Sequence, residues 1–226
     1  MNNTIHPTAV LDGDVKLGTS NRIGPYTVLI GPLEMGDNNI IGPHVVIGGP
    51  GEDTKNPRYD SSQSKIVIGH RNIIREFTAI QKPCYESVTE IGSDVHLMHG
   101  VHVPHDAILE DKVVLTPLVV IGGISRLMEG ANIGMGATVH QYSVIGQYSI
   151  VATGASAVKN VKPFSRHIPG KPISVNHYAI EKYGFSEFKH EIERYVLGNM
   201  FPVSEKIANL IRQYELFHTK SKREQY

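Results

Sequence analysis

The chain is poor in the features that mark secreted, membrane and nucleic-acid-binding proteins. Its 226 residues include one cysteine, Cys84, which excludes an internal disulfide and a multi-cysteine zinc site and fits a reducing compartment. Lys and Arg total 22 and Asp and Glu total 22, so there is no basic excess to neutralise phosphates. No apolar run approaches the roughly 18 residues of a membrane span, and the first residues lack a signal peptide's basic and apolar regions. We therefore expect a cytoplasmic protein with no membrane span and no nucleic-acid partner.

What the chain does have is an apolar residue at every sixth position. Of 23 such positions, 22 are Ile, Leu, Val or Met, where ordinary composition would give about a quarter. An amphipathic helix repeats near 3.6 residues and a strand near 2, so a strict period of six predicts a parallel β-helix. These anchor positions are Ile5, Leu11, Leu17, Ile23, Leu29, Met35, Ile41 and Ile47, then Ile68, Ile74 and Ile80, then Ile91, Leu97, Val103, Leu109, Leu115, Ile121, Leu127, Ile133, Val139, Ile145, Val151 and Ala157.

A second regularity supports this interpretation. The fourth residue after most anchors is small or β-branched, and glycine often follows an anchor directly, as at Gly24 and Gly122. Each hexad then forms one short strand and one tight corner, where glycine is accommodated easily. Three hexads make a triangular coil of about 18 residues, and adjacent coils stack roughly 4.8 Å apart.

The repeat is interrupted twice and ends before the C-terminus. Residues 48–65 and 81–90 are predicted loops that leave the coil, and loops on a rigid scaffold commonly carry binding residues. We expect a β-helix domain over residues 1–165 and a linker with C-terminal helices over 166–226.

Beyond Pro163 the pattern changes to that of a linker followed by helices. Prolines break the linker, and from about Val175 the apolar periodicity is helical. Ser186 is a predicted N-cap for a helix to about Leu197, and Ser204 for another to about Phe217. The last seven residues are expected to fray.

Four of the twelve histidines fall within ten residues, at His96, His99, His102 and His105. In the hexad frame all four lie outside the inward positions, so none is expected in the buried core. Histidine is the usual general base near neutral pH. Gly123 follows His105 by three hexads and should lie one coil away, where its uncovered backbone N–H would serve as an oxyanion site beside a base.

Several motifs resemble one enzyme family. They are His-Val-Pro-His-Asp over residues 102–106, Val-His-Gln-Tyr over 139–142, Arg-Asn-Ile-Ile-Arg-Glu over 71–76 and Lys-Tyr-Gly-Phe-Ser over 182–186. The chain resembles the UDP-N-acetylglucosamine O-acyltransferases, which transfer a 3-hydroxyacyl chain from acyl carrier protein to the sugar 3-hydroxyl in the first step of lipid A synthesis. The resemblance implies a left-handed β-helix, a homotrimer with sites between subunits, and no metal or tightly bound cofactor.

The resemblance also assigns roles to individual residues. It implies that His105 is the general base, Asp106 its carboxylate partner and Gly123 the oxyanion donor. The residues it implies in substrate binding are His102, His140, Gln141, Asp53, Lys55 and Asn176, with Thr153 gauging acyl length.

The chain departs from the family pattern at several of these positions. Ile124 stands where the family has a histidine that contacts the sugar, and Lys182-Tyr183 replaces a basic pair that contacts nucleotide phosphate. Thr153 stands where some members have a small residue, and the helical tail is shorter than usual. These differences concern the acceptor sugar and acyl length and leave the base and oxyanion site intact.

Three other functions compete with this interpretation. The first is an N- or O-acyltransferase acting on another nucleotide amino sugar of surface polysaccharide, with acyl-CoA as a further candidate donor. The second is a non-catalytic scaffold, which would not require histidines on outward positions. The third is a zinc hydratase of the γ-class carbonic anhydrase type; the histidine pair five residues apart found in that class is absent here.

Overall fold

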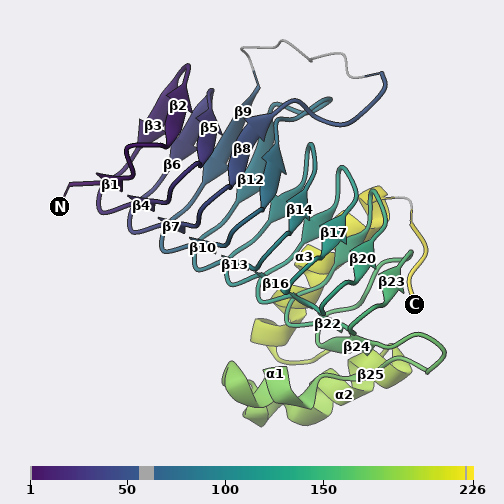
Figure 1. Cartoon of the computed structure of the whole chain (residues 1–226). Helices are drawn as coiled ribbons and strands as arrows, with labels where there is room; N and C mark the ends of the chain where they lie inside the picture. The colour runs from purple at the N-terminus through teal and green to yellow at the C-terminus, as the bar shows by residue number, and fades with distance from the viewer. Residues whose placement is uncertain (1, 56–63, 222) are drawn as a thin grey trace.

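The structure, a computed structural model, describes residues 2–55, 64–221 and 223–226. Short strands stack into a three-sided parallel β-helix, and helices gather around its C-terminal coils (Figure 1). The chain visits three sheets in turn, which we call A, B and C, and each coil contributes one strand to each sheet. The parallel β-helix predicted from the hexads is therefore confirmed.

The strands of the three sheets are as follows. Sheet A contains β1 (Thr4–Ile5), β4 (Arg22–Ile23), β7 (Ile40–Ile41), β10 (Ile73–Ile74), β13 (His96–Leu97), β16 (Val114–Leu115), β19 (Asn132–Ile133), β22 (Ile150–Val151), β24 (Ser165–His167) and the antiparallel β25 (Ser174–Val175). Sheet B contains β2 (Val10–Asp12), β5 (Val28–Ile30), β8 (Val46–Gly49), β11 (Ala79–Gln81), β14 (His102–Val103), β17 (Val120–Ile121), β20 (Thr138–Val139) and β23 (Ser156–Ala157). Sheet C contains β3 (Val15–Leu17), β6 (Leu33–Met35), β9 (Lys65–Ile68), β12 (Val88–Ile91), β15 (Ile108–Leu109), β18 (Arg126–Leu127) and β21 (Val144–Ile145).

The register between coils is three hexads, as His102 opposite Val120 illustrates. Two coils are longer, because Ile40 lies opposite Ile73 and Ile73 opposite His96. The extra residues are the two predicted loops; residues 56–63 of the first lie outside the described residues. Each loop returns the chain to register, so the scaffold continues unchanged beyond it.

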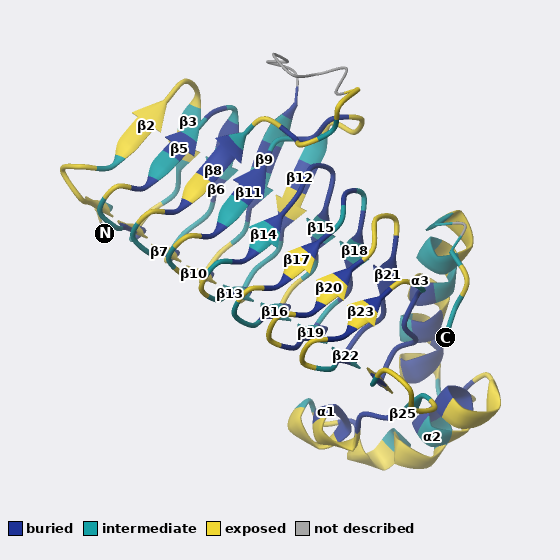
Figure 2. Cartoon of the chain, turned by 45° about the vertical axis from the view of Figure 1, so that its right-hand side comes forward, coloured by how far each residue is buried: buried dark blue, intermediate teal, exposed yellow. Residues whose placement is uncertain are grey.

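The anchor residues form the core of the coil. Every one from Ile23 to Ala157 is buried, with the small or β-branched residues of the same hexads packed beside them (Figure 2). The first coil differs, because Ile5 and Leu11 are 41% and 40% exposed. Those two residues were expected to point inward; the first coil has a neighbouring coil on one side alone, so its interior stays partly open.

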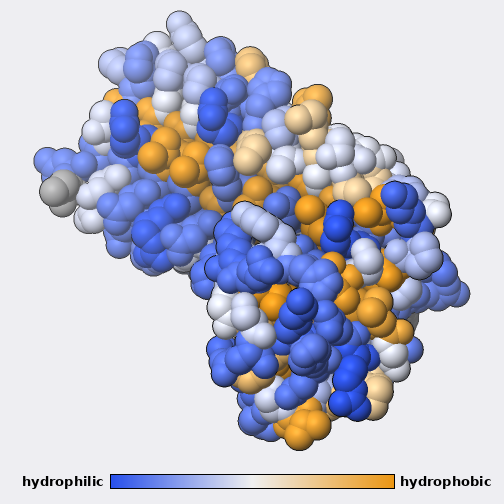
Figure 3. Space-filling view, turned by 90° about the horizontal axis from the view of Figure 1, so that it is seen from below, coloured by the Kyte–Doolittle hydropathy of each residue, from blue (hydrophilic) through white to orange (hydrophobic). Residues whose placement is uncertain are grey.

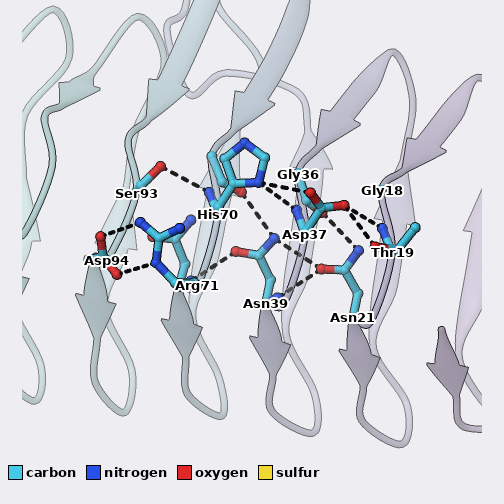
Figure 4. Close-up of polar contacts among 12 residues, drawn as sticks. Gly18, Thr19, Asn21, Gly36, Asp37, Asn39, His70, Arg71, Ser93 and Asp94 are labelled. Carbon is cyan, nitrogen blue, oxygen red and sulfur yellow. Dashed lines mark hydrogen bonds and ion pairs between the residues drawn. The ribbon is translucent and has the colours of Figure 1, made fainter. Parts of the chain in front are cut away.

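A ladder of asparagines runs inside the first coils, beside sheet A (Figure 4). The Asn39 amide nitrogen donates to Asn21 Oδ1 (3.0 Å) and to the Gly69 carbonyl (3.0 Å), and Asn39 Oδ1 accepts from the Asn72 N–H (2.9 Å). Each ladder amide thus satisfies a carbonyl and an N–H of the following coil. The ladder supplies partners for buried backbone groups that the corner geometry leaves without strand pairing.

Both loops leave the helix at the same edge. The first joins β8 to β9 and the second joins β11 to β12, so each connects sheet B to sheet C. The next coil carries His105 and Asp106 between β14 and β15, again from sheet B to sheet C. We call this column of connections the B–C edge; the column joining sheet A to sheet B is the A–B edge.

The C-terminal part contains α1 (His177–Lys182), the 3-10 turn η1 (Ser186–Phe188), α2 (Lys189–Gly198) and α3 (Glu205–Ser221). Their apolar faces form a second core with Tyr148 and Phe164 of the last coils. Ser186 does not act as the predicted N-cap, because it begins the 3-10 turn and α2 follows without a side-chain cap. Ser204 does precede α3, and its hydroxyl donates to Glu191 of α2 (2.8 Å), which ties the two helices together.

The chain's last residues do not fray as expected. Residues 223–226 lie against the last coils, where the Tyr226 ring stacks on His167 at 4.0 Å. None of the helices among the described residues is long and apolar enough to cross a membrane.

The asparagine ladder should make a measurable contribution to stability. Asn39→Leu leaves the Gly69 carbonyl and the Asn72 N–H without their partners, and each buried orphan group costs about 1–3 kcal/mol. We expect the free energy of unfolding in urea to fall by roughly 2–4 kcal/mol. Asn132→Ser, on the outward face of β19, is the control and should change it little. Equal stability of the two variants would contradict the role assigned to the ladder.

Candidate active site

The turns of the B–C edge set residues with chemical function one above another. His105, Gly123 and Gln141 occupy one position in three successive turns, and Asp106, Ile124 and Tyr142 follow them with φ near +60°. Backbone hydrogen bonds lock the column, since the Ile124 N–H donates to the His105 carbonyl (3.1 Å). The spacing of three hexads predicted that His105 and Gly123 would be neighbours, and they are.

Gly123 can have no side chain in this column. An added Cβ would lie 2.4 Å from Cε1 and 2.5 Å from Nε2 of His105, so the imidazole rests on the glycine backbone. The same kind of turn on the A–B edge carries proline at the corresponding position, as Pro25 and Pro43 precede residues with positive φ. The fold therefore does not need the N–H there. Within the described part of the chain the Gly123 N–H has no acceptor, and the His105 ring packs against the Cα of the same residue.

His105 is held by its neighbour Asp106. The Nδ1–H donates to Asp106 Oδ2 at 2.7 Å, which leaves Nε2 toward Gly123 as the proton-accepting atom. The Asp106 side chain is fully buried. A buried carboxylate needs hydrogen-bond donors, and this one has several.

Those donors come from the second loop. Consecutive backbone N–H groups of Cys84, Tyr85 and Glu86 all donate to the Asp106 carboxylate, the shortest contact being 2.8 Å from Glu86. Such a run of N–H groups makes a concave anion site. The loop thus fixes the carboxylate and with it the imidazole.

The same loop covers His105. The side chain of His105 is 11% exposed, and the Tyr85 ring meets it edge-on with centroids 6.0 Å apart. His105 is thus buried without belonging to the core of the coil, as was expected of the four clustered histidines. It does point out of the coil, as its hexad position requires, but loop residues then close over it.

Sequence reasoning missed this covering layer. Gly51 of the first loop packs so closely that an added Cβ would lie 2.3 Å from Cys84 Sγ and 2.8 Å from His105 Cβ. The departure of both loops from one edge, just before the histidine coil, was the available signal. Loop conformation itself does not follow from spacing.

Cys84, His105 and Asp106 offer three ligand atoms within 4.8 Å of one another. In the structure these atoms have other roles. Burial, with help from Asp106 and Asp53, raises the pKa of the Cys84 thiol to about 11, so the thiol is protonated at neutral pH. The Asp106 oxygens are also engaged by N–H donors.

The described part of the first loop brings Asp53 and Lys55 to the site. The Asp53 carboxylate accepts from the Lys55 N–H (2.7 Å), and the pKa of Asp53 is lowered by this bond, by the Tyr85 hydroxyl and by nearby His105. His102 lies in the same group, with Nε2 3.7 Å from Glu52. Burial lowers the pKa of His102, so its imidazole is mainly neutral at pH 7.

His140 and Gln141 lie on the B–C edge, one coil beyond Gly123, and both are exposed. They border an open groove on the sheet B side together with Val120, Gly122 and Val158. On the sheet C side, a cavity of about 340 Å³ lies between Asp106, Ile124, Tyr142 and the end of α3 at Phe217. The edge is therefore flanked by recesses on both sides.

Two predicted site residues are not brought to His105 within one chain. Thr153 lies exposed on the A–B edge, between β22 and β23. Asn176 is buried among the helices, where its oxygen accepts from the Ala179 N–H at the start of α1 and its nitrogen donates to the Tyr148 carbonyl. Their roles in binding stay predictions.

Parts of the sequence are similar to known hexapeptide-repeat transferases. Residues 14–49 match the model described as Bacterial transferase hexapeptide (six repeats). A curated acyl-[acyl-carrier-protein]–UDP-N-acetylglucosamine O-acyltransferase from Burkholderia multivorans is 34% identical over 140 residues, covering 60% of this chain and 53% of its own length. One of the same name from Aliivibrio fischeri is 28% identical over 151 residues, covering 64% and 57%. The chain thus spans somewhat more than half the length of the curated relatives it matches.

The solved structures agree on the fold. UDP-N-acetylglucosamine O-acyltransferase from Moraxella catarrhalis superposes with a TM-score of 0.76 at 24% identity, covering 98% of each chain. The protein is a left-handed parallel β-helix built from hexapeptide repeats, with a histidine–aspartate pair on one edge. The chain is similar in both sequence and fold to UDP-N-acetylglucosamine O-acyltransferases.

The burial of Cys84 predicts an unreactive thiol. A pKa of about 11 in place of 9.0 lowers the thiolate fraction at pH 8 by roughly a hundredfold, and the residue is fully buried. We expect Ellman's reagent to label the folded protein at least about a hundredfold more slowly than the guanidinium-unfolded protein. Fast labelling of protein that keeps its native circular dichroism spectrum would show that the loop does not cover the site.

Proposed function

We propose that the protein transfers a 3-hydroxyacyl group from acyl carrier protein to the 3-hydroxyl of UDP-N-acetylglucosamine, as the first step of lipid A synthesis in the cytoplasm. The observation that carries the proposal is His105 Nε2 lying against the Gly123 backbone while Nδ1 is bonded to buried Asp106. Attack of a hydroxyl on a thioester requires a general base for the hydroxyl proton and a hydrogen-bond donor for the oxyanion, and both lie here side by side. The names of the curated relatives supply the donor and acceptor.

The proposed chemistry uses the chain's own groups. His105 Nε2 takes the proton of the sugar hydroxyl as its oxygen attacks the thioester carbonyl. Asp106 holds the imidazole and stabilises the imidazolium that forms. The Gly123 N–H donates to the oxyanion of the tetrahedral adduct, which collapses by breaking the carbon–sulfur bond, and His105 returns the proton to the departing thiolate.

The remaining site residues have proposed roles in binding. Asp53 and His102 each interact electrostatically with His105, and Lys55 is bonded to Asp53, so we propose that these three residues contact the sugar. His140 and Gln141 border the groove next to the oxyanion position. Asn176 and Thr153 would act only across a subunit boundary, because each lies away from the B–C edge of its own chain.

A trimer would provide that boundary, and the surface supports one. Along the A–B edge, exposed rings of Tyr26, His44 and Phe77 stack on each other 5.1 and 5.3 Å apart. Leu118 continues the line, 56% exposed. Figure 3 shows apolar residues along the β-helix surface, bordered by hydrophilic ones. Such a row of exposed apolar side chains is typical of a subunit interface.

Ile124 favours a second candidate function. Its side chain borders the cavity beside Asp106, at the turn position where the resembling family has a sugar-contacting histidine. An amino sugar would need less assistance there, because a neutral amine already attacks a thioester well. Transfer to the nitrogen of another nucleotide sugar, from an acyl carrier protein or coenzyme A, is therefore the alternative.

The proposed base can be tested by substitution. His105→Ala should lower kcat by about 10² to 10⁴, the usual cost of losing a general base, and Asp106→Asn should lower it by at least about tenfold. Product masses are read after incubation with UDP-N-acetylglucosamine, nucleotide amino sugars and 3-hydroxyacyl thioesters. His190→Ala, a 94% exposed side chain, is the control. Undiminished turnover by folded His105→Ala protein would refute the mechanism, and product on an amino sugar alone would favour the second candidate.

The trimer has its own test. Sedimentation equilibrium of the purified protein should give three times the 24.9 kDa of one chain. Phe77→Asp with Leu118→Asp should yield monomers that keep the β-helix, because both side chains point away from the core. Val203→Asp, 89% exposed on the connection before α3, should leave the trimer unchanged. A trimer that survives the double substitution would place the interface elsewhere.

A further inference from the structure

The C-terminal residues 223–226 form a strap across the last coils. The Asn160 N–H donates to the Glu224 carbonyl (2.8 Å) and the Tyr226 N–H to the Asn160 carbonyl (3.1 Å), as in a parallel strand pair. Gln225 is bonded to Tyr214 of α3 through its side chain (2.9 Å). The strap is held by the β-helix and by α3. Its first residue, Arg223, therefore has a defined position.

Arg223 lies on the B–C edge. Its Nε donates to the Gln141 carbonyl (3.1 Å), and a terminal guanidinium nitrogen lies 2.7 Å from His140 Nδ1. Gln141 stacks directly beyond the oxyanion turn, since an added Cβ on Gly122 would lie 2.4 Å from the Gln141 nitrogen. The guanidinium therefore lies about one coil from the reacting position, in contact with two residues that line the groove described above.

This contact determines the state of His140. Nδ1 of His140 lies 2.7 Å from the guanidinium nitrogen and 3.2 Å from the Gln141 carbonyl oxygen. A guanidinium has donors and no acceptor, so in the shorter contact Nδ1 is the acceptor and carries no proton. The ring proton then lies on Nε2, on the side of the imidazole away from Arg223. His140 is thereby fixed as a hydrogen-bond donor.

Arg223 also brings a positive charge without a counterion. Throughout the described residues it makes no ion pair with a carboxylate, although it is half-buried. A guanidinium with free N–H groups, beside a second donor at Nε2, matches the oxygens of a phosphate.

We propose that Arg223 is a binding residue for a substrate phosphate and the positioning residue that holds His140 as an Nε2–H donor. This inference rests on the proposed acyl transfer. The phosphate belongs either to the diphosphate of the nucleotide sugar or to the phosphopantetheine arm of the acyl donor. Both present the same oxygen acceptors, and kinetics distinguish them.

The kinetic test uses Arg223→Ala and Arg223→Lys. A lost hydrogen bond to a charged group corresponds to about a tenfold to hundredfold effect. Arg223→Ala should therefore raise KM about ten- to a hundredfold for one substrate, with kcat nearly unchanged. A rise in KM for the nucleotide sugar identifies its diphosphate, and a rise for the acyl donor identifies phosphopantetheine. Arg223→Lys keeps the charge without the fork of donors and should recover only part of the loss.

The matched control is Glu224→Ala, on the same strap. It removes the ion pair between Glu224 and Lys159 (2.5 Å), away from His140. If the strap were merely structural, both substitutions would lower the melting temperature and leave both KM values unchanged. That result would overturn the proposal.

A second readout does not depend on turnover. Nitrogen-15 spectra of the histidine rings, with His140 assigned by its loss in His140→Gln, should show the Nε2–H tautomer in the wild type and a tautomer mixture in Arg223→Ala. Titration with UDP and with 4′-phosphopantetheine should shift the His140 signals, with weaker binding in Arg223→Ala. If the wild type transfers no acyl group, the proposed function fails and this titration still decides the inference; no change of tautomer and no shift with either probe would overturn it.

Discussion

The contact between His105 and Gly123 at the centre of the site depends on the advance of three hexads per coil. The period comes from burying one anchor in each hexad, because a slip of a single residue would turn the anchors out of the core. Stacking then converts sequence spacing into contact, so His105 rests on Gly123 and Gln141 lies beyond it. A glycine with an unused N–H beside an imidazole is thus a product of register, and the scaffold needs no special backbone to create it.

The coil alone could not hold a buried carboxylate. Its own backbone groups pair with adjacent coils, so Asp106 takes its donors from Cys84, Tyr85 and Glu86, in a loop that interrupts the repeat. After the loop the chain resumes the same strand register, so the loop contributes hydrogen-bond donors to the site without changing the core. The coils and the loops therefore have different roles. The coils fix the positions of residues along the B–C edge, and the loops supply hydrogen-bond donors and cover the site from solvent.

The fold and the central pair of the site were predictable because both follow from local spacing. The strands and the contact of His105 with Gly123 need only the hexad and its threefold multiple. The burial of His105 and the anion site at residues 84–86 depend on loop conformations that no period specifies. The position of the strap was not predicted, because the short polar segment 223–226 has no sequence signal of its own. It is held by tertiary contacts such as the stacking of Tyr226 on His167. Helix starts were predicted near Ser186 and Ser204, but Ser186 begins the 3-10 turn before α2, and the Ser204 hydroxyl donates to Glu191.

The open first coil has a consequence for how the molecule loses structure. A stack in which each coil touches only its neighbours unravels from whichever end is less covered, and partial opening moves inward coil by coil. Here Ile5 and Leu11 are half uncovered at one end, whereas the strap and helices cover the other. The His105 turn lies several coils inward from the open end, so exchange with solvent at the first coils would leave the imidazole, its carboxylate and the glycine beneath it undisturbed.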